Sequence, residues 1–305
     1  MIQYIYLGRV DYAEALRLQE ELVALRQQER IGNVLLLLEH PPVLTLGRNA
    51  SRSNILASDE LLARRGVTLH EINRGGDVTY HGPGQLIGYP IFDLRSLQNP
   101  ANGNRLGPVD FVRLMEEALI GVCGDFGIAA GRICKLTGVW CGLRPADGGT
   151  LDKSCEAVSQ SSPEAAHGRK IGAIGIHVAR GVTSHGFAFN VTTDLRDFLL
   201  INPCGITDRP VTSLEKELAR GTVEATVTLP SLESIAHRAA RHFGRVFEQP
   251  TVAFESLAAL RAQAMAEPCV TGEVAAPVFP AEDRPVETPA EIERLQHRAE
   301  HRVRA

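Results

Sequence analysis

The sequence lacks several features that mark whole classes of protein. Its longest strongly apolar run, from Val34 to Leu38, is far shorter than the ~20 residues that a membrane-spanning helix needs. The 305 residues carry a formal charge of −4, so no general basic field is available to bind a nucleic acid backbone. We therefore expect neither a membrane association nor a nucleic acid partner.

Several short chemical motifs are also missing. The six cysteines include no Cys-x-x-Cys pair, which is typical of a reducing compartment rather than of a disulfide framework or a zinc site. The ten histidines form no His-Glu-x-x-His motif, so we expect no metal. No Gly-x-x-x-x-Gly-Lys-Ser/Thr phosphate loop is present, and the N-terminus has no basic region followed by a long apolar core. These absences predict a cytoplasmic protein that needs no nucleotide.

The sequence has enough apolar residues, 44%, for a sizeable core. Its periodicity predicts an α/β protein with mixed helices and strands. We expect one catalytic domain over residues 1–250, a polar insert over 142–169 and a largely flexible C-terminal extension over 251–305, where prolines recur. The predicted helices span 11–30, 58–65, 110–126, 231–248 and 254–265.

The most informative stretch runs from Arg74 to Asp93. Four of its first eleven residues are glycine, which indicates sharp turns or a close approach of the backbone to another group. The apolar run from Leu86 to Phe92 follows without alternation, as in a strand buried on both faces. Together they predict a pocket wall next to a buried sheet. A simple β-hairpin, in which the glycines only form turns, remains the alternative.

Three blocks of the sequence resemble, in the same order, the lipoyl(octanoyl) transferases. The first is RGGDVTYHGPGQ from Arg74, and the second joins KIGAIGIHV from Lys170 to TSHGFAFN from Thr183. The third is INPCG from Ile201, and EHPPVLTLGR from Glu39 is a further similar run. Three ordered blocks arise by chance far less easily than one.

The resemblance implies a biotin/lipoyl protein ligase-like fold and an acyltransferase. Such an enzyme moves an octanoyl group from the phosphopantetheine thioester of acyl carrier protein to a lysine of a lipoyl domain. The implied acceptors are the lipoyl domains of 2-oxoacid dehydrogenase complexes and the glycine cleavage H protein. No cofactor and no ATP are expected, because both the donor and the enzyme intermediate are thioesters.

The resemblance also implies the site residues. The catalytic pair corresponds to Cys204 and Lys170, and His185 is a candidate auxiliary group. The implied substrate-binding residues are Arg74, Gly75, Gly76, Asp77, Val78, Thr79, Tyr80, His81, Ala173, Ile174, Gly175, Gly186, Phe187 and Ala188. His81 and His185 either polarise the carbonyl and orient the amine, or are hydrogen-bonded pocket histidines without a chemical role.

Residue chemistry agrees with this pair but does not prove it. A cysteine reacts as a thiolate, so it needs a nearby cation and an accessible turn. Lys170 and Cys204 are 34 positions apart, and spacing alone leaves the pairing open. Cys269, which also follows a proline, is the competing nucleophile. Two other functions stay open: an ATP-dependent lipoate or biotin ligase, and a non-catalytic acyl-binding protein.

For the histidines outside these three blocks we predict no ligand or catalytic role. His40 is expected to be a loop residue without a ligand role. His237 and His242 are expected on the solvated face of their helix. Met115 and Cys123 are expected in the core, and Trp140 is expected to anchor packing.

Overall fold

The computed structural model describes residues 1–143, 168–202, 209–221 and 228–265. Residues 1–267 form one compact unit, and residues 268–305 lie outside the described part. Most of the predicted insert lies outside it as well. Among the described residues no helix is long and apolar enough to cross a membrane.

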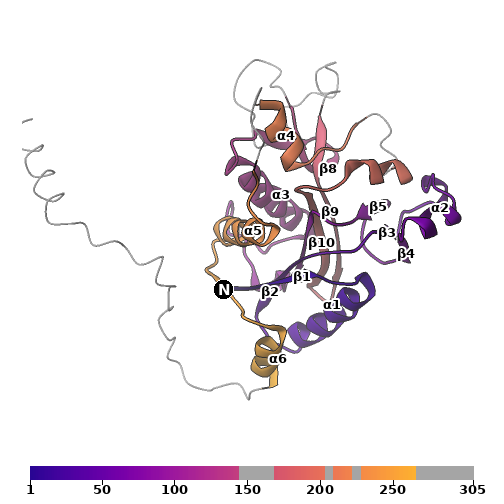
Figure 1. The fold of residues 1–305 in the computed structure, drawn as a ribbon. Helices are drawn as coiled ribbons and strands as arrows, with labels where there is room; N and C mark the ends of the chain where they lie inside the picture. Colours follow the sequence, from indigo (N-terminus) through magenta and orange to yellow (C-terminus); the bar gives the residue numbers. More distant parts are fainter. Residues whose placement is uncertain (144–167, 203–208, 222–227, 266–305) are drawn as a thin grey trace, which may run out of the picture. The chain divides into compact units, whose positions relative to one another are not determined.

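A mixed eight-stranded sheet forms the centre of the compact unit (Figure 1). Its strand order is β11-β1-β2-β6-β10-β9-β8-β7; β1 is parallel to β2 and β11, and the pairs from β2 to β7 are antiparallel. The strands are β1 (Ile2–Arg9), β2 (Asn33–Glu39), β6 (Gln85–Ile91), β7 (Ala130–Ile133), β8 (Leu136–Cys141), β9 (Arg169–Ala179), β10 (Val182–Asn190) and β11 (Thr251–Ala253). This mixed sheet confirms the predicted α/β class.

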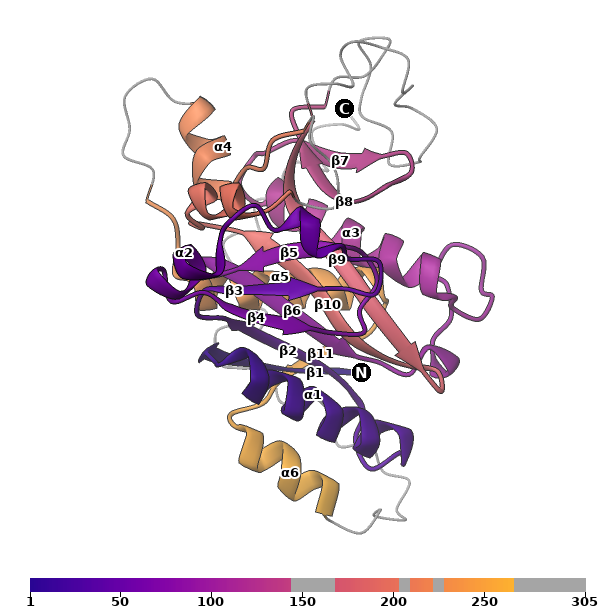
Figure 2. The same cartoon turned by 90° about the vertical axis from the view of Figure 1, so that its right-hand side faces the viewer.

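Helices cover both faces of this sheet (Figures 1 and 2). Alternate residues of β2 point to opposite sides, as the strand period requires. Leu35 and Leu37 join the core under α3 and α5, whereas Leu36 and Leu38 join the core under α1 and α6. The helices are α1 (Tyr12–Gln27), α3 (Pro108–Gly124), α5 (Leu232–Val246) and α6 (Leu257–Met265).

The ends of these helices follow from local sequence. Asp11 caps α1 by accepting hydrogen bonds from the backbone N–H groups of Ala13 and Glu14. Ser231 caps α5 in the same way by accepting from Ser234. The strand β11 and helix α6 belong to the compact unit of residues 1–267.

A second, three-stranded sheet lies beside the glycine-rich stretch (Figure 2). It contains β3 (Val43–Leu46), β4 (Thr68–Glu71) and β5 (Val78–His81), with α2 (Asp59–Arg64) and the 3-10 helices η1 (Arg52–Asn54) and η4 (Leu195–Leu200) nearby. Since β5 pairs with β3 while β6 pairs with β2 and β10, β5 and β6 do not form a hairpin. The hairpin alternative is therefore wrong: the Gly82 to Gly84 turn carries the chain from one sheet to the other.

The strands β9 and β10 do form a hairpin. Val182 pairs with Ala179, so the turn contains only Arg180 and Gly181. Their φ values of 52° and 85° match a type I′ turn, which suits the twist of a two-residue hairpin. The hairpin brings the two parts of the second sequence block, from Lys170 and from Thr183, side by side.

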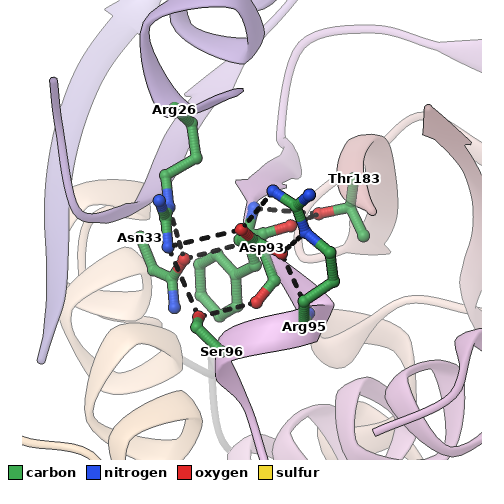
Figure 3. A network of polar contacts seen from close by, with 7 residues as sticks. Arg26, Asn33, Asp93, Arg95, Ser96 and Thr183 are labelled. Carbon is green, nitrogen blue, oxygen red and sulfur yellow. Dashed lines mark hydrogen bonds and ion pairs between the residues drawn. The ribbon is translucent and has the colours of Figure 1, made fainter. Parts of the chain in front are cut away.

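A polar network fastens the far end of β6 (Figure 3). Asp93 accepts two hydrogen bonds from the Arg95 side chain, at 2.9 and 2.8 Å, and these lower the pKa of the carboxyl group. The Asn33 side-chain oxygen accepts from the Asp93 N–H and from Arg26. Thr183 of β10 donates to Pro90 at 2.6 Å. The network therefore ties α1, β2, β6 and β10 together.

Candidate functional site

Three cavities meet at Lys170, near the start of β9. The inner pocket has a volume of about 60 Å³ and lies between β5, β9 and β10. The side pocket, about 30 Å³, includes Trp140, Phe198 and Arg209. The outer groove is far larger, about 650 Å³, and runs between the glycine-rich stretch, α3 and the β7–β8 turn. A group attached next to Lys170 can thus reach three differently shaped spaces.

Most of the predicted binding residues line the inner pocket. Its walls are Tyr12, Arg74, Gly75, Gly76, Thr79, His81, Tyr89, Lys170, Ala173, Ile174, Gly175, His185, Gly186, Phe187 and Ala188. The pocket therefore joins residues from the first two sequence blocks. Two glycines explain the close packing of these walls: a Cβ on Gly175 would lie 2.7 Å from the Gly75 oxygen, and Gly76 adopts a φ of +90°.

Three of the predicted binding residues lie elsewhere. Val78 and Tyr80 are buried in the core of the three-stranded sheet, because side chains alternate along β5 and only Thr79 and His81 face the pocket. Asp77 lines the outer groove instead. A contiguous block in the sequence thus divides between a core face and a pocket face.

Burial determines the protonation of the histidines in and next to the inner pocket. Arg74 is 8% exposed and donates hydrogen bonds to the Thr45 hydroxyl and carbonyl oxygens. Burial lowers the pKa of His81 to about 3 and that of His185 to about 4, and the Arg74 cation contributes to both shifts. Burial likewise lowers the pKa of neighbouring His40 to about 4. All three imidazoles are therefore neutral near pH 7.

His185 combines a strained backbone with an incomplete set of hydrogen bonds. It lies within β10 at a φ of 55°, a conformation unusual for a non-glycine residue. Its Nε2 lies 2.7 Å from the Asn73 side-chain oxygen, so Nε2 carries the proton and Nδ1 is an acceptor. Nδ1 is buried and has no hydrogen-bond partner in the described part of the chain. Such a buried acceptor is suited to a ligand that donates a hydrogen bond.

Lys170 lies between an aromatic ring and the cavities. Its Nζ is 5.1 Å from the centre of the Trp140 ring, and the Arg209 guanidinium lies 5.8 Å from the same centre. Trp140 is fully buried, as the sequence predicted for a packing anchor. The Lys170 backbone pairs with Pro210 and Thr212 through hydrogen bonds of 2.9 Å. These contacts place two cations beside one ring.

Cys204 lies outside the described residues, but both of its flanks are defined. Before it, Asn202 donates a backbone hydrogen bond of 2.7 Å to Asn54. After it, Val211 forms a parallel bridge with Lys170. Of the described cysteines, Cys123 and Cys141 are buried in the core, Cys134 is half-buried, and none lines the three cavities. The hydrogen bond to Cys141 and burial raise the pKa of the Cys123 thiol.

Comparison with known proteins identifies the family. Residues 11–236 match the lipoyl protein ligase A/B catalytic domain. The chain belongs to this family. It is 54% identical over 256 residues to the Octanoyltransferase of Acidobacterium capsulatum, covering 84% of this chain and 94% of that protein. It is 50% identical to the Octanoyltransferase of Koribacter versatilis, covering 84% and 88%. The predicted resemblance is confirmed, and the chain is a transferase enzyme.

Solved structures of lipoate protein ligases share the predicted fold. A bi-partite lipoate protein ligase from Thermoplasma acidophilum superposes with a TM-score of 0.57 at 15% identity, covering 87% of this chain and 91% of that one. Lipoate-protein ligase A bound with ATP gives a TM-score of 0.52 at 16% identity, covering 87% and 93%. The family fold thus persists where the sequences have diverged widely.

The sequence analysis missed two tyrosines of this site. Tyr12 and Tyr89 line the inner pocket, and the Tyr12 ring stacks 6.4 Å from that of His81. His40 follows the end of β2, as a loop residue was predicted to do, but it is fully buried and its Nε2 lies 2.7 Å from the Tyr89 hydroxyl. A signal was present, because the run from Glu39 already resembled the family.

One histidine prediction was wrong. His242 is 4% exposed, packs against Gly121 of α3 and lies 3.0 Å from Asp125. Gly121 leaves the space that a Cβ would fill, so the imidazole is buried between two helices. His237, on the same helix, is half-exposed as expected. Among the described residues, no group of three or more His, Cys, Asp or Glu side chains could hold a metal ion.

Proposed function

We propose that this enzyme transfers an octanoyl group from a phosphopantetheine thioester of acyl carrier protein to a lysine of a lipoyl domain. The observation that carries the proposal is the meeting of three cavities at Lys170, beside the chain that flanks Cys204. One cavity can hold the acyl chain, while the others admit donor and acceptor. The names of the relatives in this family support the acyl group.

In the first step, the Cys204 thiolate attacks the thioester carbonyl carbon. A bond forms between that carbon and Cys204 Sγ, and the bond to the pantetheine sulfur breaks. The Lys170 ammonium favours the thiolate by its charge and gives its proton to the leaving sulfur. The product is an octanoyl thioester on the enzyme and a free pantetheine thiol.

In the second step, a neutral lysine amine of the lipoyl domain attacks the same carbonyl carbon. The new carbon–nitrogen bond replaces the bond to Cys204 Sγ, and Lys170, now neutral, accepts the proton that the amine loses. The change from thioester to amide is downhill, so no ATP is consumed. The accepted substrates are lipoyl domains of 2-oxoacid dehydrogenase complexes and the glycine cleavage H protein.

The inner pocket accounts for binding of an acyl chain. Its glycines at positions 175 and 186 present backbone rather than side chains, and Phe187 and Ile174 supply apolar surface. Burying about seven methylene groups at ~0.8 kcal/mol each gives a gross gain on the order of 5 kcal/mol. This gain favours octanoyl over short acyl groups. The remaining binding residues of the first block hold the pocket walls in place.

We assign His185 to the second step. Its buried Nδ1 is an unprotonated acceptor in the inner pocket, and the Asn73 contact at 2.7 Å fixes the ring. An incoming amine can donate a hydrogen bond to this atom, which orients the nitrogen toward the acyl-enzyme carbonyl. The protonated imidazole would lack this acceptor, and its low pKa prevents that state near neutral pH.

Intact-mass spectrometry after mixing the enzyme with octanoyl-acyl carrier protein tests the proposal. We expect a covalent adduct of one octanoyl group without ATP, and its loss when a lipoyl domain is added. An adduct that requires ATP would instead indicate a ligase. Octanoyl binding without any covalent adduct would indicate an acyl-binding protein. Both of these outcomes contradict the proposed transfer.

A further inference from the structure

The outer groove is not needed to hold the acyl chain, yet it opens directly beside Lys170. Its volume of about 650 Å³ is roughly ten times that of the inner pocket, about 60 Å³. One wall consists of the first two turns of α3, and the opposite wall consists of Ile174, Gly175 and Ile176 of β9. A long substrate segment attached to the reacting carbonyl can leave the site through this groove.

The walls of the outer groove are largely apolar. Val109, near the start of α3, is 71% exposed, although large apolar side chains are generally buried. Val112 lies three residues later on the same helix face, and Leu136 lies across the groove on β8. These side chains present an apolar surface that a ligand can cover.

Cations lie at the outer part of the groove. Lys135 is exposed in the two-residue turn between β7 and β8, and Arg113 follows Val109 by one helical turn. Arg113 lies 2.7 Å from Glu116, and Arg132 pairs with both Glu116 and Glu117 at 3.0 Å, so the charges of these four side chains balance. The Lys135 ammonium supplies the net positive charge at this end.

Among the described residues that line the groove, Asp77 alone is acidic. Asp77 accepts hydrogen bonds from the backbone N–H groups of Val78 and Ser51 and from the Asn54 amide. Its carboxylate therefore serves to hold the glycine-rich stretch. The groove has apolar walls along its length and a cationic outer end.

We propose that the outer groove holds the phosphopantetheine arm of the octanoyl donor, with its thiol end at Lys170 and its phosphate at Lys135 and Arg113. This assignment rests on the proposed function, because it needs a thioester donor. The arm is a flexible chain of amide and alkyl groups that ends in an anionic phosphodiester. The apolar walls fit its alkyl groups, and the cations fit its phosphate.

Two small donors that differ only in the phosphate test the assignment: octanoyl-4′-phosphopantetheine and octanoyl-pantetheine. The Lys135→Glu variant should raise KM for the phosphorylated donor about tenfold and leave KM for the other donor unchanged, with a smaller difference at high salt. Lys216→Glu makes the same charge change at an exposed position of α4 (Leu214–Gly221) away from all three cavities, and it should alter neither value.

A second variant tests the groove wall. Val109→Asp places a negative charge in the first turn of α3, where an acidic residue is compatible with the helix, so the protein should fold. It should raise KM for octanoyl-4′-phosphopantetheine more than KM for octanoyl-pantetheine. If Lys135→Glu and Val109→Asp change KM for the two donors equally, or change neither value, the groove assignment is wrong. If the unmodified enzyme forms no adduct even with octanoyl-acyl carrier protein, the proposed function fails as well.

Discussion

The strands β6 and β9 lie in the same sheet but differ in how they are buried. Every residue of β6 is buried, since β2 and β10 flank it and helices cover both faces. Most of β9, from Ala173 to Ala179, is only half-buried, because it borders the inner pocket and the outer groove. The β6 side fills its space with aliphatic and aromatic side chains, whereas the β9 side leaves space and lines it with glycine and neutral histidine.

The two regions have different roles: the β6 side stabilises the fold, and the β9 side forms the candidate site. On the β6 side, interdigitated side chains supply the hydrophobic free energy that keeps the unit folded. On the β9 side, backbone approaches closely at Gly175, and His185 holds a strained φ with an unpartnered nitrogen. Such local strain is retained where the surrounding structure is rigid. The two kinds of region should therefore respond differently to substitution.

The largest effect is expected at the proposed dyad. Cys204→Ser should abolish the octanoyl adduct, because a hydroxyl is not appreciably ionised near neutral pH even beside a lysine. Lys170→Ala should acylate slowly, at a rate that rises with pH toward the ordinary thiol pKa of ~8.5. Rates of adduct formation by mass spectrometry check both. Cys269→Ser is the control; if it loses the adduct and Cys204→Ser keeps it, Cys204 is not the nucleophile.

Substitutions in the packed core on the β6 side should lower the free energy of unfolding and leave the chemistry unchanged. Leu35→Ala removes a fully buried side chain beneath α3 and α5, at an expected cost of about 2–5 kcal/mol in the free energy of unfolding. The acylation rate of the folded fraction should not change. Denaturant unfolding measures the first quantity, with Leu199→Ala, at a position 77% exposed, as the control. A Leu35→Ala protein with unchanged stability and a slower acylation rate would contradict this division of roles between the β6 and β9 sides.

His185→Asn should separate the two chemical steps. Asparagine tolerates the positive φ at this position but does not present the same buried ring nitrogen. Transfer from the acyl-enzyme to a lipoyl domain should slow about 10- to 100-fold while adduct formation proceeds normally. Single-turnover measurements distinguish the steps, and His177→Asn on β9 is the control. Equal slowing of both steps would assign His185 a merely structural role.

Gly76→Val should have a smaller effect on the pocket. The backbone at Gly76 has a φ of +90°, which a branched residue adopts only with strain of about 1–2 kcal/mol. Relaxing that strain moves the wall of the inner pocket, so we expect acyl transfer to fall about tenfold in a folded protein. Gly103→Val introduces similar strain at a φ of +71° in a surface turn, and it should keep full activity. If Gly76→Val transfers the acyl group at an unaltered rate, the backbone conformation at Gly76 is not needed for transfer.

The effect that is smallest near neutral pH is a dependence of stability on pH. The pKa values of His40, His81 and His185 are about 4, 3 and 4 in the folded protein, against about 6.5 when unfolded. The unfolded chain therefore binds more protons between pH 6.5 and 4, so the free energy of unfolding is complete above pH 6.5 and falls as pH decreases through this window. Each histidine contributes up to about 1.4 kcal/mol per pH unit.

Unfolding titrations at several pH values measure this slope. His40→Gln should reduce it, because glutamine does not titrate, while His237→Gln at the half-exposed position should leave it unchanged. An equal slope in the His40→Gln variant would show that the buried imidazoles do not control acid stability.

The sequence by itself determined the elements and most of the pocket. Local signals suffice for β6, whose apolar run has no polar interruption, and for the cap of α1 at Asp11. Family resemblance selected the residues from Arg74 to His81, from Ala173 to Gly175 and from Gly186 to Ala188, and eleven of those fourteen binding residues line the inner pocket. These features depend on residue type and short-range pattern.

Only the tertiary structure decided which side chains within a block face the pocket. Val78 and Tyr80 turn away because β5 pairs with β3 rather than with β6, and that pairing joins segments that are distant in sequence. His242 is buried because Gly121 on another helix leaves room for it. The three cavities meet at Lys170 because β9 lies beside β8 and β10 and pairs with Val211. Such contacts arise from long-range packing, which no local pattern of residues encodes.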